Sequence, residues 1–393
     1  MTSRFDAAAI RSEFPVTKRM LYLDSAHQTP LATSVRSALT DFYSESHETA
    51  GPKPVWLRRV EQTRARVASL FNAKPSEVAF TKNTSEGMNI AAHAIPFAAG
   101  DNVVLIEGDH PNAAYAWLNQ RRRGVEVRFA KLAAESEIAS ADTFRPLIDE
   151  RTKVICLSHV SFHAGQRHDL ASIGRLCRER GIYLVVDAMQ SVGVLPVDVQ
   201  ALNISILAAG THKGLLVPQG LGVLVVRDGL DELQPAYLAM SSLANPPADY
   251  IARPDDMATR KDAARFEIGN LNLPDIQALD AAVEMITKVG VENVERHVLA
   301  LGDRLIEILD AQAIPLVGPR KREHRAHIYV LRVPVGPWAE HFANNQVRVS
   351  PERDGIRISF AMFNTLDDVE RLAQVLRLYG AKNSAGQAVE RID

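Results

Sequence analysis

The sequence predicts an α/β protein built on an open, mostly parallel sheet with helices on both faces. Between about Asp101 and Val226, short apolar runs alternate with helical patterns, which indicates parallel strands joined by crossover helices. Runs such as Val103–Ile106 and Leu184–Val186 are continuously apolar, as in strands buried on both faces. The predicted strands are 102–107, 125–130, 153–158, 183–187, 204–208 and 222–226.

Helical patterns precede this sheet. Trp56–Asn72 spaces apolar residues among arginine and glutamate, which predicts an amphipathic helix. A second helix is predicted to continue through Gly87–Ala94, because Asn83, Thr84 or Ser85 can cap its N-terminus.

The pattern changes after Gly269. A long helical pattern runs from Pro274 to about Gln312 and is followed by strands and a last helix, which predicts a separate α+β unit. Those later elements are 328–333, 347–350, 356–360 and the helix 366–379. We therefore expect an N-terminal segment packing on the small domain, a large domain and a small C-terminal α+β domain, at 1–20, 21–270 and 271–393.

Composition excludes several classes of partner. Lys+Arg 45 against Asp+Glu 47 gives a formal net charge of −2, so no global field attracts nucleic acid or an anionic membrane. Two cysteines argue against a disulfide framework or a thiolate metal site, and we predict no metal. The N-terminus lacks the apolar stretch of a signal peptide, and no apolar run approaches the ~20 residues of a membrane helix. We expect a soluble, cytoplasmic protein that acts on small molecules.

Lys213 is the central candidate for chemistry. It follows the predicted strand 204–208 and precedes the apolar residues 215–217, which would partly desolvate it. Desolvation disfavours the ammonium form and frees the amine to attack an aldehyde as a Schiff-base lysine. Taken alone, Lys213 reads more often as a surface lysine in a turn.

Asp187 ends a predicted buried strand. Sheets of this kind bind ligands outside the carboxyl ends of their strands, so the side chain should face the crevice. A fixed anion there would keep a pyridine nitrogen protonated, and the protonated ring would stabilise negative charge on a substrate α-carbon. Alone, Asp187 would be a helix cap or a metal ligand about as often.

Two further features lie at predicted strand ends. Thr84 and Ser85 precede a helix whose free N–H groups and dipole favour a phosphate. His110, which follows the strand 102–107, could lie flat over an aromatic cofactor. Each is more often an ordinary capping residue, but with Lys213 and Asp187 they favour a pyridoxal-phosphate (PLP) site jointly.

The order of these motifs resembles the class V aminotransferases. This family of fold type I PLP enzymes includes cysteine desulfurases, selenocysteine lyases, isopenicillin N epimerase and kynureninase. The similarity runs from Tyr22 to about Tyr379, and it implies a mostly parallel seven-stranded sheet in an α/β/α sandwich. The matching motifs are Tyr22–Ala26, Asn83–Glu86, Asp109–Asn112, Asp187–Gln190, Thr211–Lys213 and Arg265–Gly269.

The resemblance implies a role for each matching residue. Lys213 would hold PLP as a Schiff base, Asp187 would face the pyridinium, and His110 would stack on the ring. Gln190 would donate a hydrogen bond to the ring oxygen. The phosphate would be held by Thr84, Ser85 and His212, with Thr211 supplying a further hydroxyl.

The resemblance also implies a homodimer with sites at the interface, where Asn270 or Asn272 reaches the neighbouring subunit's phosphate. Arg357 matches the arginine that binds the substrate α-carboxylate, and a guanidinium grips a carboxylate through two hydrogen bonds. The remaining predicted substrate-binding residues are Arg353, a weaker companion, together with His27 and Phe162.

This chain departs from the desulfurases. They carry a nucleophilic cysteine just before the arginine, whereas Gln346–Gly355 contains none. Cys156 and Cys177 fall in a predicted strand and helix and are expected to be packing residues. Phe162 stands where desulfurases place an asparagine, so the substrate pocket has diverged.

We predict an aminotransferase acting on an amino acid, because no second acid or nucleophile is visible beside the freed Lys213 amine, a general base. A carbon–sulfur or carbon–selenium lyase and an epimerase are alternatives with the same primary residues. A nucleotide-binding oxidoreductase would need a glycine-rich turn that the sequence lacks. A catalytically silent scaffold would have no need for Lys213, Asp187, His110 and Arg357 together.

Overall fold

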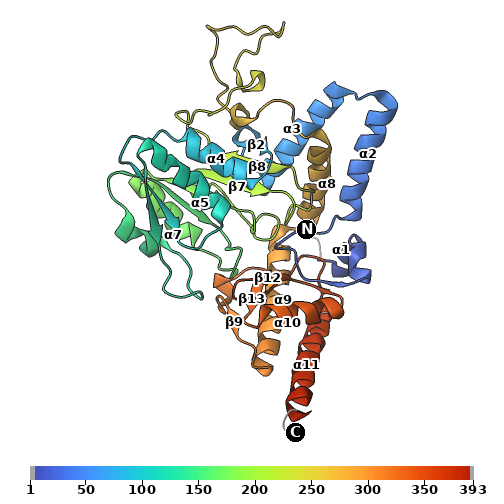
Figure 1. Ribbon diagram of the computed structural model, residues 1–393. Coiled ribbons are helices and arrows are strands. Elements are labelled where there is room, and N and C mark those ends of the chain that lie inside the picture. Colours follow the sequence, from blue (N-terminus) through green and yellow to red (C-terminus); the bar gives the residue numbers. More distant parts are fainter. Residues whose placement is uncertain (1–4, 390–393) are drawn as a thin grey trace.

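The computed structural model describes residues 5–389 and contains a seven-stranded sheet (Figure 1). Residues 1–4 of the predicted N-terminal segment and 390–393 of the predicted C-terminal domain lie outside that range. In spatial order the strands are β2 (Val78–Thr81), β8 (Gly222–Val226), β7 (Ile206–Gly210), β6 (Tyr183–Asp187), β5 (Thr152–Ser158), β3 (Asn102–Ile106) and β4 (Glu126–Ala130). Strand β8 is antiparallel to both neighbours, and the other pairs are parallel. The predicted fold class is confirmed.

Apolar side chains fill both faces of this sheet. In β6, Leu184 and Val186 enter one core while Val185 enters the other, as successive strand residues must. Helices α4 (Thr84–Ala94) and α5 (Pro111–Leu118) cover the Val185 face. The opposite core includes side chains from α2 (Thr33–Thr49), α3 (Lys53–Leu70), α7 (Leu170–Arg180) and α8 (Leu273–Val289), and the short helix α6 (Ala141–Phe144) also contributes.

Helix α4 packs unusually close to the sheet. A Cβ atom at Gly87 would lie 2.6 Å from the Cβ of Ala208 in β7, so only glycine permits this approach. The approach places Thr84, the first residue of α4, beside Gly210 at the carboxyl end of β7. The N-terminus of α4 therefore lies where the chain leaves β7 toward Lys213.

A second, antiparallel sheet lies in the C-terminal part of the chain. Its strands in spatial order are β12 (Ser350–Glu352), β13 (Gly355–Ser359), β10 (Ile328–Leu331) and β9 (Leu316–Val317). The accompanying helices are α9 (Val291–Ala311), α10 (Val335–Asn344) and α11 (Leu366–Val389). The predicted long helical pattern is two helices, α8 and α9, because Gly290 adopts a φ of +82° and ends α8.

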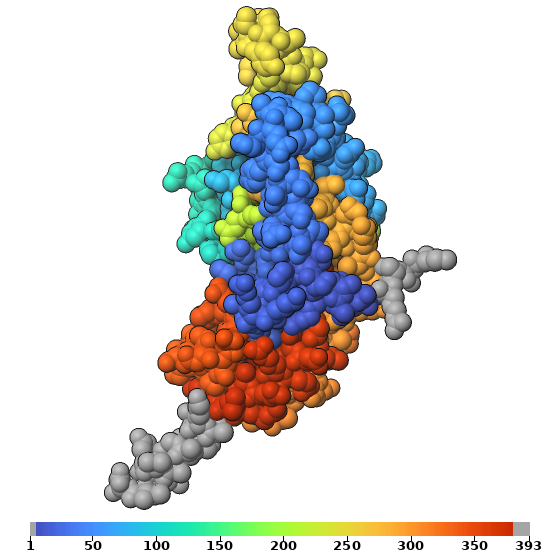
Figure 2. Space-filling view, turned by 90° about the vertical axis from the view of Figure 1, so that its right-hand side faces the viewer, coloured from blue at the N-terminus to red at the C-terminus, as the bar shows by residue number. Residues whose placement is uncertain are grey.

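The N-terminal elements contact this C-terminal part. Strand β1 (Leu21–Tyr22) pairs in parallel with β11 (Val347–Arg348). Arg11, in α1 (Ala7–Ser12), forms an ion pair with Asp368 and donates to the carbonyl of Phe363. Figure 2 shows the N-terminal elements in blue running down the surface to the C-terminal elements in red. The division into domains stays a prediction.

The segment 238–261 projects from the body of the protein (Figures 1 and 2). It contains a short 3₁₀ turn, Met240–Ser242, and a β-bridge between Leu243 and Thr259, and it exposes Tyr250, Ile251 and Met257. Within residues 5–389, no helix combines the length and the apolar character needed to cross a membrane.

A buried ion pair joins α3 to the segment before α8. Arg64 and Glu267 are 2.7 Å apart with nearly inaccessible side chains, and Glu267 also accepts the backbone N–H of Phe80 in β2. We expect Arg64→Met to destabilise the protein by about 3–5 kcal/mol, because it leaves a buried carboxylate without its cation. Urea unfolding measures this. Arg66→Met is the matched control: Arg66 lies on the same helix in half-exposed pairs and should cost less than ~1 kcal/mol. Equal losses would contradict the expectation.

Candidate active site

A cavity of about 520 Å³ opens at the carboxyl ends of the parallel strands. This is where open α/β sheets bind ligands, and the volume lies in the usual range of about 300–1,000 Å³ for small-ligand sites. Its lining comes from segments far apart in the sequence. The lining includes Lys82, Asn83, Thr84, Ser85, His110, Ser158, Phe162, Asp187, Met189, Gln190, His212 and Lys213.

Lys213 lines this cavity just after β7. The residues that follow it, Leu215, Leu216 and Val217, are fully buried, as the sequence predicted. Burial, and then the charge of Arg357, lower the pKa of Lys213 from 10.5 to about 8. About a tenth of Lys213 therefore carries a neutral, nucleophilic amine at pH 7, far more than an ordinary lysine would.

Asp187 is the last residue of β6 and lines the same cavity. Its Oδ1 accepts the backbone N–H of Met189 at 2.9 Å, and its Oδ2 has no hydrogen bond within residues 5–389. Burial raises the pKa of Asp187 to about 7. A buried carboxylate of this kind favours a cationic partner, since a positive charge beside it would restore the anion.

The N-terminus of α4 forms another wall. Asn83 caps the helix by accepting the N–H of Glu86 at 2.9 Å, and the first residues of the helix, Thr84 and Ser85, face the cavity. The helix dipole adds positive potential at this end. His212 lies on the same lining, and burial lowers its pKa to about 4, so its ring is neutral at neutral pH.

His110 also lines the cavity and is the N-cap of α5. Its ring meets that of Phe162 edge-on, with centroids 5.0 Å apart and planes at 79°. The neighbouring residue, Asp109, accepts hydrogen bonds from the N–H and the hydroxyl of Ser158 at 2.7 and 2.6 Å. Burial, followed by the charge of Lys213, lowers the pKa of His110. The pattern Asp-His at a strand end was noted from the sequence, but this role of Asp109 was missed.

Two predicted contacts with the cofactor look different in the structure. Gln190 lines the cavity, but its Nε2 donates to the carbonyl of Ala26 at 3.0 Å, and its buried Oε1 has no partner. Thr211 does not line the cavity: it is fully buried, and its hydroxyl faces the carbonyls of Pro218 and Leu221 at 3.1 and 3.0 Å. The hydroxyl is committed to its own loop, and the predicted phosphate contact of Thr211 stays a prediction.

Other predicted residues lie outside the cavity. Asn270 is exposed, and Asn272 instead caps α8, with its amide nitrogen 2.7 Å from Asp275. Their contact with a neighbouring subunit stays a prediction. His27 is exposed near His212, whose pKa it affects. Arg353 lines an adjacent cavity of about 320 Å³ and bonds Asp354 at 2.8 Å, so the structure does not bring it to Arg357.

Arg357 lies behind Phe162 rather than in the cavity lining. Its Nη1 donates to the carbonyl of Phe162 at 2.9 Å and forms an ion pair with Glu352 at 2.6 Å. Sequence reasoning missed Glu352. The turn residues Asp354-Gly355 could have revealed it, because a hairpin there puts Glu352 and Arg357 on one face.

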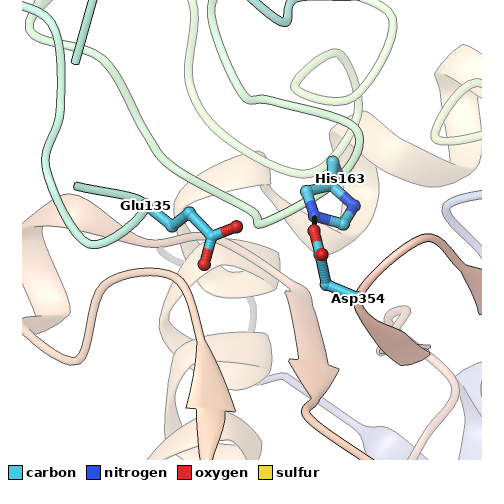
Figure 3. A group of neighbouring side chains, drawn as sticks. All are labelled: Glu135, His163 and Asp354. Carbon is cyan, nitrogen blue, oxygen red and sulfur yellow. Dashed lines mark hydrogen bonds and ion pairs between the residues drawn. The ribbon is translucent and has the colours of Figure 1, made fainter. Parts of the chain in front are cut away.

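Glu135 and His163 line the adjacent cavity and form a cluster with Asp354, shown in Figure 3. One ligand atom from each lies within 4.8 Å of the others, the spacing a metal ion would need. Each carboxylate is already paired with an arginine, Glu135 with Arg332 and Asp354 with Arg353. The predicted absence of a metal stays a prediction.

One cavity at the carboxyl ends of this mostly parallel sheet brings together an amine, a buried carboxylate and a helix N-terminus. This combination defines the class of PLP-dependent enzymes. A family model described as aminotransferase class-V matches residues 21–342. An uncharacterized aminotransferase of Schizosaccharomyces pombe is 33% identical over 377 residues, which cover 94% of this chain and 95% of the relative. The chain belongs to the class-V aminotransferase family, which confirms the resemblance.

Solved structures of similar proteins have the same fold. The apo cysteine desulfurase of Thermococcus onnurineus superposes with a TM-score of 0.88 at 25% identity, covering 96% of this chain and 98% of that one. A mutant of C-DES with glycine linked covalently to its PLP superposes with a TM-score of 0.85 at 22% identity, covering 93% and 98%. PLP is the cofactor, as the sequence predicted.

The residues present fit that cofactor. Lys213 offers an amine with a lowered pKa, Asp187 a buried carboxylate oxygen without a hydrogen bond, and Gln190 a buried oxygen without a partner. Thr84 and Ser85 add a helix N-terminus for a phosphate. When bound, PLP withdraws electrons from the α-carbon of an attached amino acid and makes its bonds labile.

The lowered pKa of Lys213 sets the pH dependence of cofactor capture. Below the pKa of about 8 the ammonium form predominates and cannot attack an aldehyde. We expect the rate at which apoprotein captures PLP to rise about tenfold per pH unit below that value and to level off above it. Stopped-flow absorbance measures the rate. A profile that keeps rising to the ordinary lysine pKa of 10.5 would contradict the assignment.

Proposed function

We propose that this protein is an aminotransferase that takes the amino group of an amino acid onto PLP. The observation that carries the proposal is the amine of Lys213, which has a pKa of about 8 beside the cavity. The pKa of this amine is close to neutral pH, as the pKa of an efficient general base must be. Transamination asks for one base that removes a proton from the substrate α-carbon and delivers it to the adjoining cofactor carbon.

Two other chemistries of the family, cysteine desulfuration and epimerisation, require further groups. A cysteine desulfurase of the type described above needs an accessible thiolate, but Cys156 and Cys177 are the two cysteines of the chain and are 2% and 1% exposed. Burial raises the pKa of Cys177 to about 12 and that of Cys156 above its ordinary range. An epimerase needs an acid on the opposite face, and the lowered pKa values of His110 and His212 leave both rings neutral.

Other residues of the site would position the substrate and stabilise the charge of the cofactor. Asp187 places a negative charge at the end of β6, where it stabilises a protonated ring nitrogen. Phe162 and His110 cover one part of the cavity with apolar surface that excludes water. Arg357 is the candidate for holding the substrate carboxylate, through a guanidinium that now contacts Phe162 and Glu352.

A single-turnover experiment tests the proposal. Holoenzyme is mixed with individual amino acids and no acceptor, and the cofactor spectrum and released products are followed together. We expect pyridoxamine phosphate and a 2-oxo acid in equal amounts. Release of sulfide or selenide would replace the proposal with a lyase, and solvent deuterium at an inverted α-carbon would replace it with an epimerase.

A further inference from the structure

The guanidinium assigned to the substrate carboxylate already holds a carboxylate of the protein. Arg357 Nη1 and Glu352 Oε1 are 2.6 Å apart, and the side chains are 5% and 15% exposed. A charge-assisted contact this short, with little water around it, is a strong competitor for any incoming anion. A substrate carboxylate therefore meets an occupied arginine.

The hairpin of β12 and β13 delivers this carboxylate. Ser350 lies opposite Arg357, and Glu352 lies opposite Gly355. Since strand residues two apart share a face, Glu352 and Arg357 are diagonal neighbours on one face. Arg353 and Asp354 form the tight turn between the strands, and Gly355 begins β13 with a φ of +151°, which favours glycine. The pair is thus built into the backbone rather than formed by a chance side-chain rotamer.

The pair lies within electrostatic reach of the reacting amine. Arg357 lowers the pKa of Lys213 and Glu352 raises it, so the two charges oppose each other there. Arg357 also donates to the carbonyl of Phe162, whose residue lines the main cavity. The ion pair therefore lies next to the main cavity, separated from it by Phe162.

Both partners have an unused polar atom nearby. Arg357 Nε is buried without a hydrogen bond, so the guanidinium retains a donor for another anion. Glu352 Oε2 lies 3.6 Å from Nδ1 of His163, which is also buried without a partner. Asp354 holds the other ring nitrogen of His163 at 2.7 Å, as Figure 3 shows. Glu352 therefore has a second position beside His163, whose Nδ1 can donate to a carboxylate when that nitrogen carries a proton.

We propose that Glu352 determines substrate specificity by occupying Arg357 until a substrate carboxylate displaces it toward His163. This rests on the proposed function only in taking Arg357 as the carboxylate-binding residue. In the resting site the Glu352–Arg357 pair is neutral overall. A primary amine without a carboxylate on its reacting carbon leaves the pair intact, whereas an amino acid must break it. The site therefore accepts simple amines as amino donors alongside amino acids.

Alanine and ethylamine differ only by the carboxylate and provide a matched test on the holoenzyme. We expect Glu352→Gln to raise the ratio of the alanine rate to the ethylamine rate, measured from cofactor absorbance in single turnovers, about tenfold. Glu352→Ala, measured in parallel, should give the same shift. Glu340→Gln is the control, because it removes a charge from an exposed position on α10, outside the group of Arg357, Glu352, His163 and Asp354. It should leave the ratio unchanged.

Propionate separates this proposal from the proposed function, because it has no amino group and cannot be transaminated. Calorimetry should show propionate binding about tenfold more tightly to Glu352→Gln than to the unaltered holoenzyme, with the gain lost when Arg357→Met is added. These results would hold for a lyase or an epimerase too. Equal propionate affinities, or an equal shift from Glu340→Gln, would overturn the role of Glu352.

Discussion

Replacing Lys213 by alanine should abolish covalent binding of PLP and lower turnover by at least about 10³-fold, because one side chain supplies both the tether and the general base. The fold should survive. The lysine is partly desolvated and its pKa is lowered to about 8, so its ammonium form contributes no net stability that the variant would lose. Turnover, PLP content after gel filtration and thermal unfolding measure these effects.

Lys82→Ala is the matched control, since Lys82 lines the same cavity just before the N-cap of α4. It should retain covalently bound PLP. Normal turnover by Lys213→Ala, or loss of covalent PLP from Lys82→Ala alone, would contradict the assignment.

Asp187→Asn should bind PLP more weakly and lower turnover by about 10²- to 10³-fold, the usual loss when one charge-stabilising group is removed. The amide has the same shape and can still accept the N–H of Met189. What it lacks is the negative charge that keeps a ring nitrogen protonated. The effect should therefore fall on turnover and on the cofactor spectrum, with little change in the unfolding temperature.

Asp101→Asn controls for the loss of a buried aspartate. Asp101 lies beside β3 at the opposite end of the sheet, is 6% exposed and accepts the N–H of Ala98 at 2.8 Å. It should leave turnover unchanged. A similar loss in both variants would show that the effect of Asp187→Asn is structural.

The central strands could be predicted because burial on both faces leaves a continuous apolar run, as in Leu184–Val186. Strand β2 was missed: Val78–Thr81 is four residues long, and its pairing with β8 is decided by tertiary contacts. The break at Gly290 was missed because the apolar helical pattern continues through it. One glycine with a positive φ changes the direction of the chain without changing the pattern.

In the candidate site, too, some residues could be predicted from the sequence and others could not. Lys213, Asp187 and His110 line one cavity because residues that follow parallel strands meet at one edge of the sheet. Thr211 is adjacent in sequence to this group yet faces its own loop, since the direction of a side chain in a turn depends on backbone angles that sequence spacing does not specify. Glu352 was missed because its contact with Arg357 crosses a hairpin, and only the strand register reveals it.

The most direct test of the account is to locate the attached cofactor. Holoenzyme is reduced with borohydride, digested and mapped by mass spectrometry, which requires no substrate. We expect a single pyridoxyl phosphate group, on the peptide that contains Lys213. Attachment to the Lys82 peptide, or no attachment at all in protein that binds PLP, would contradict it.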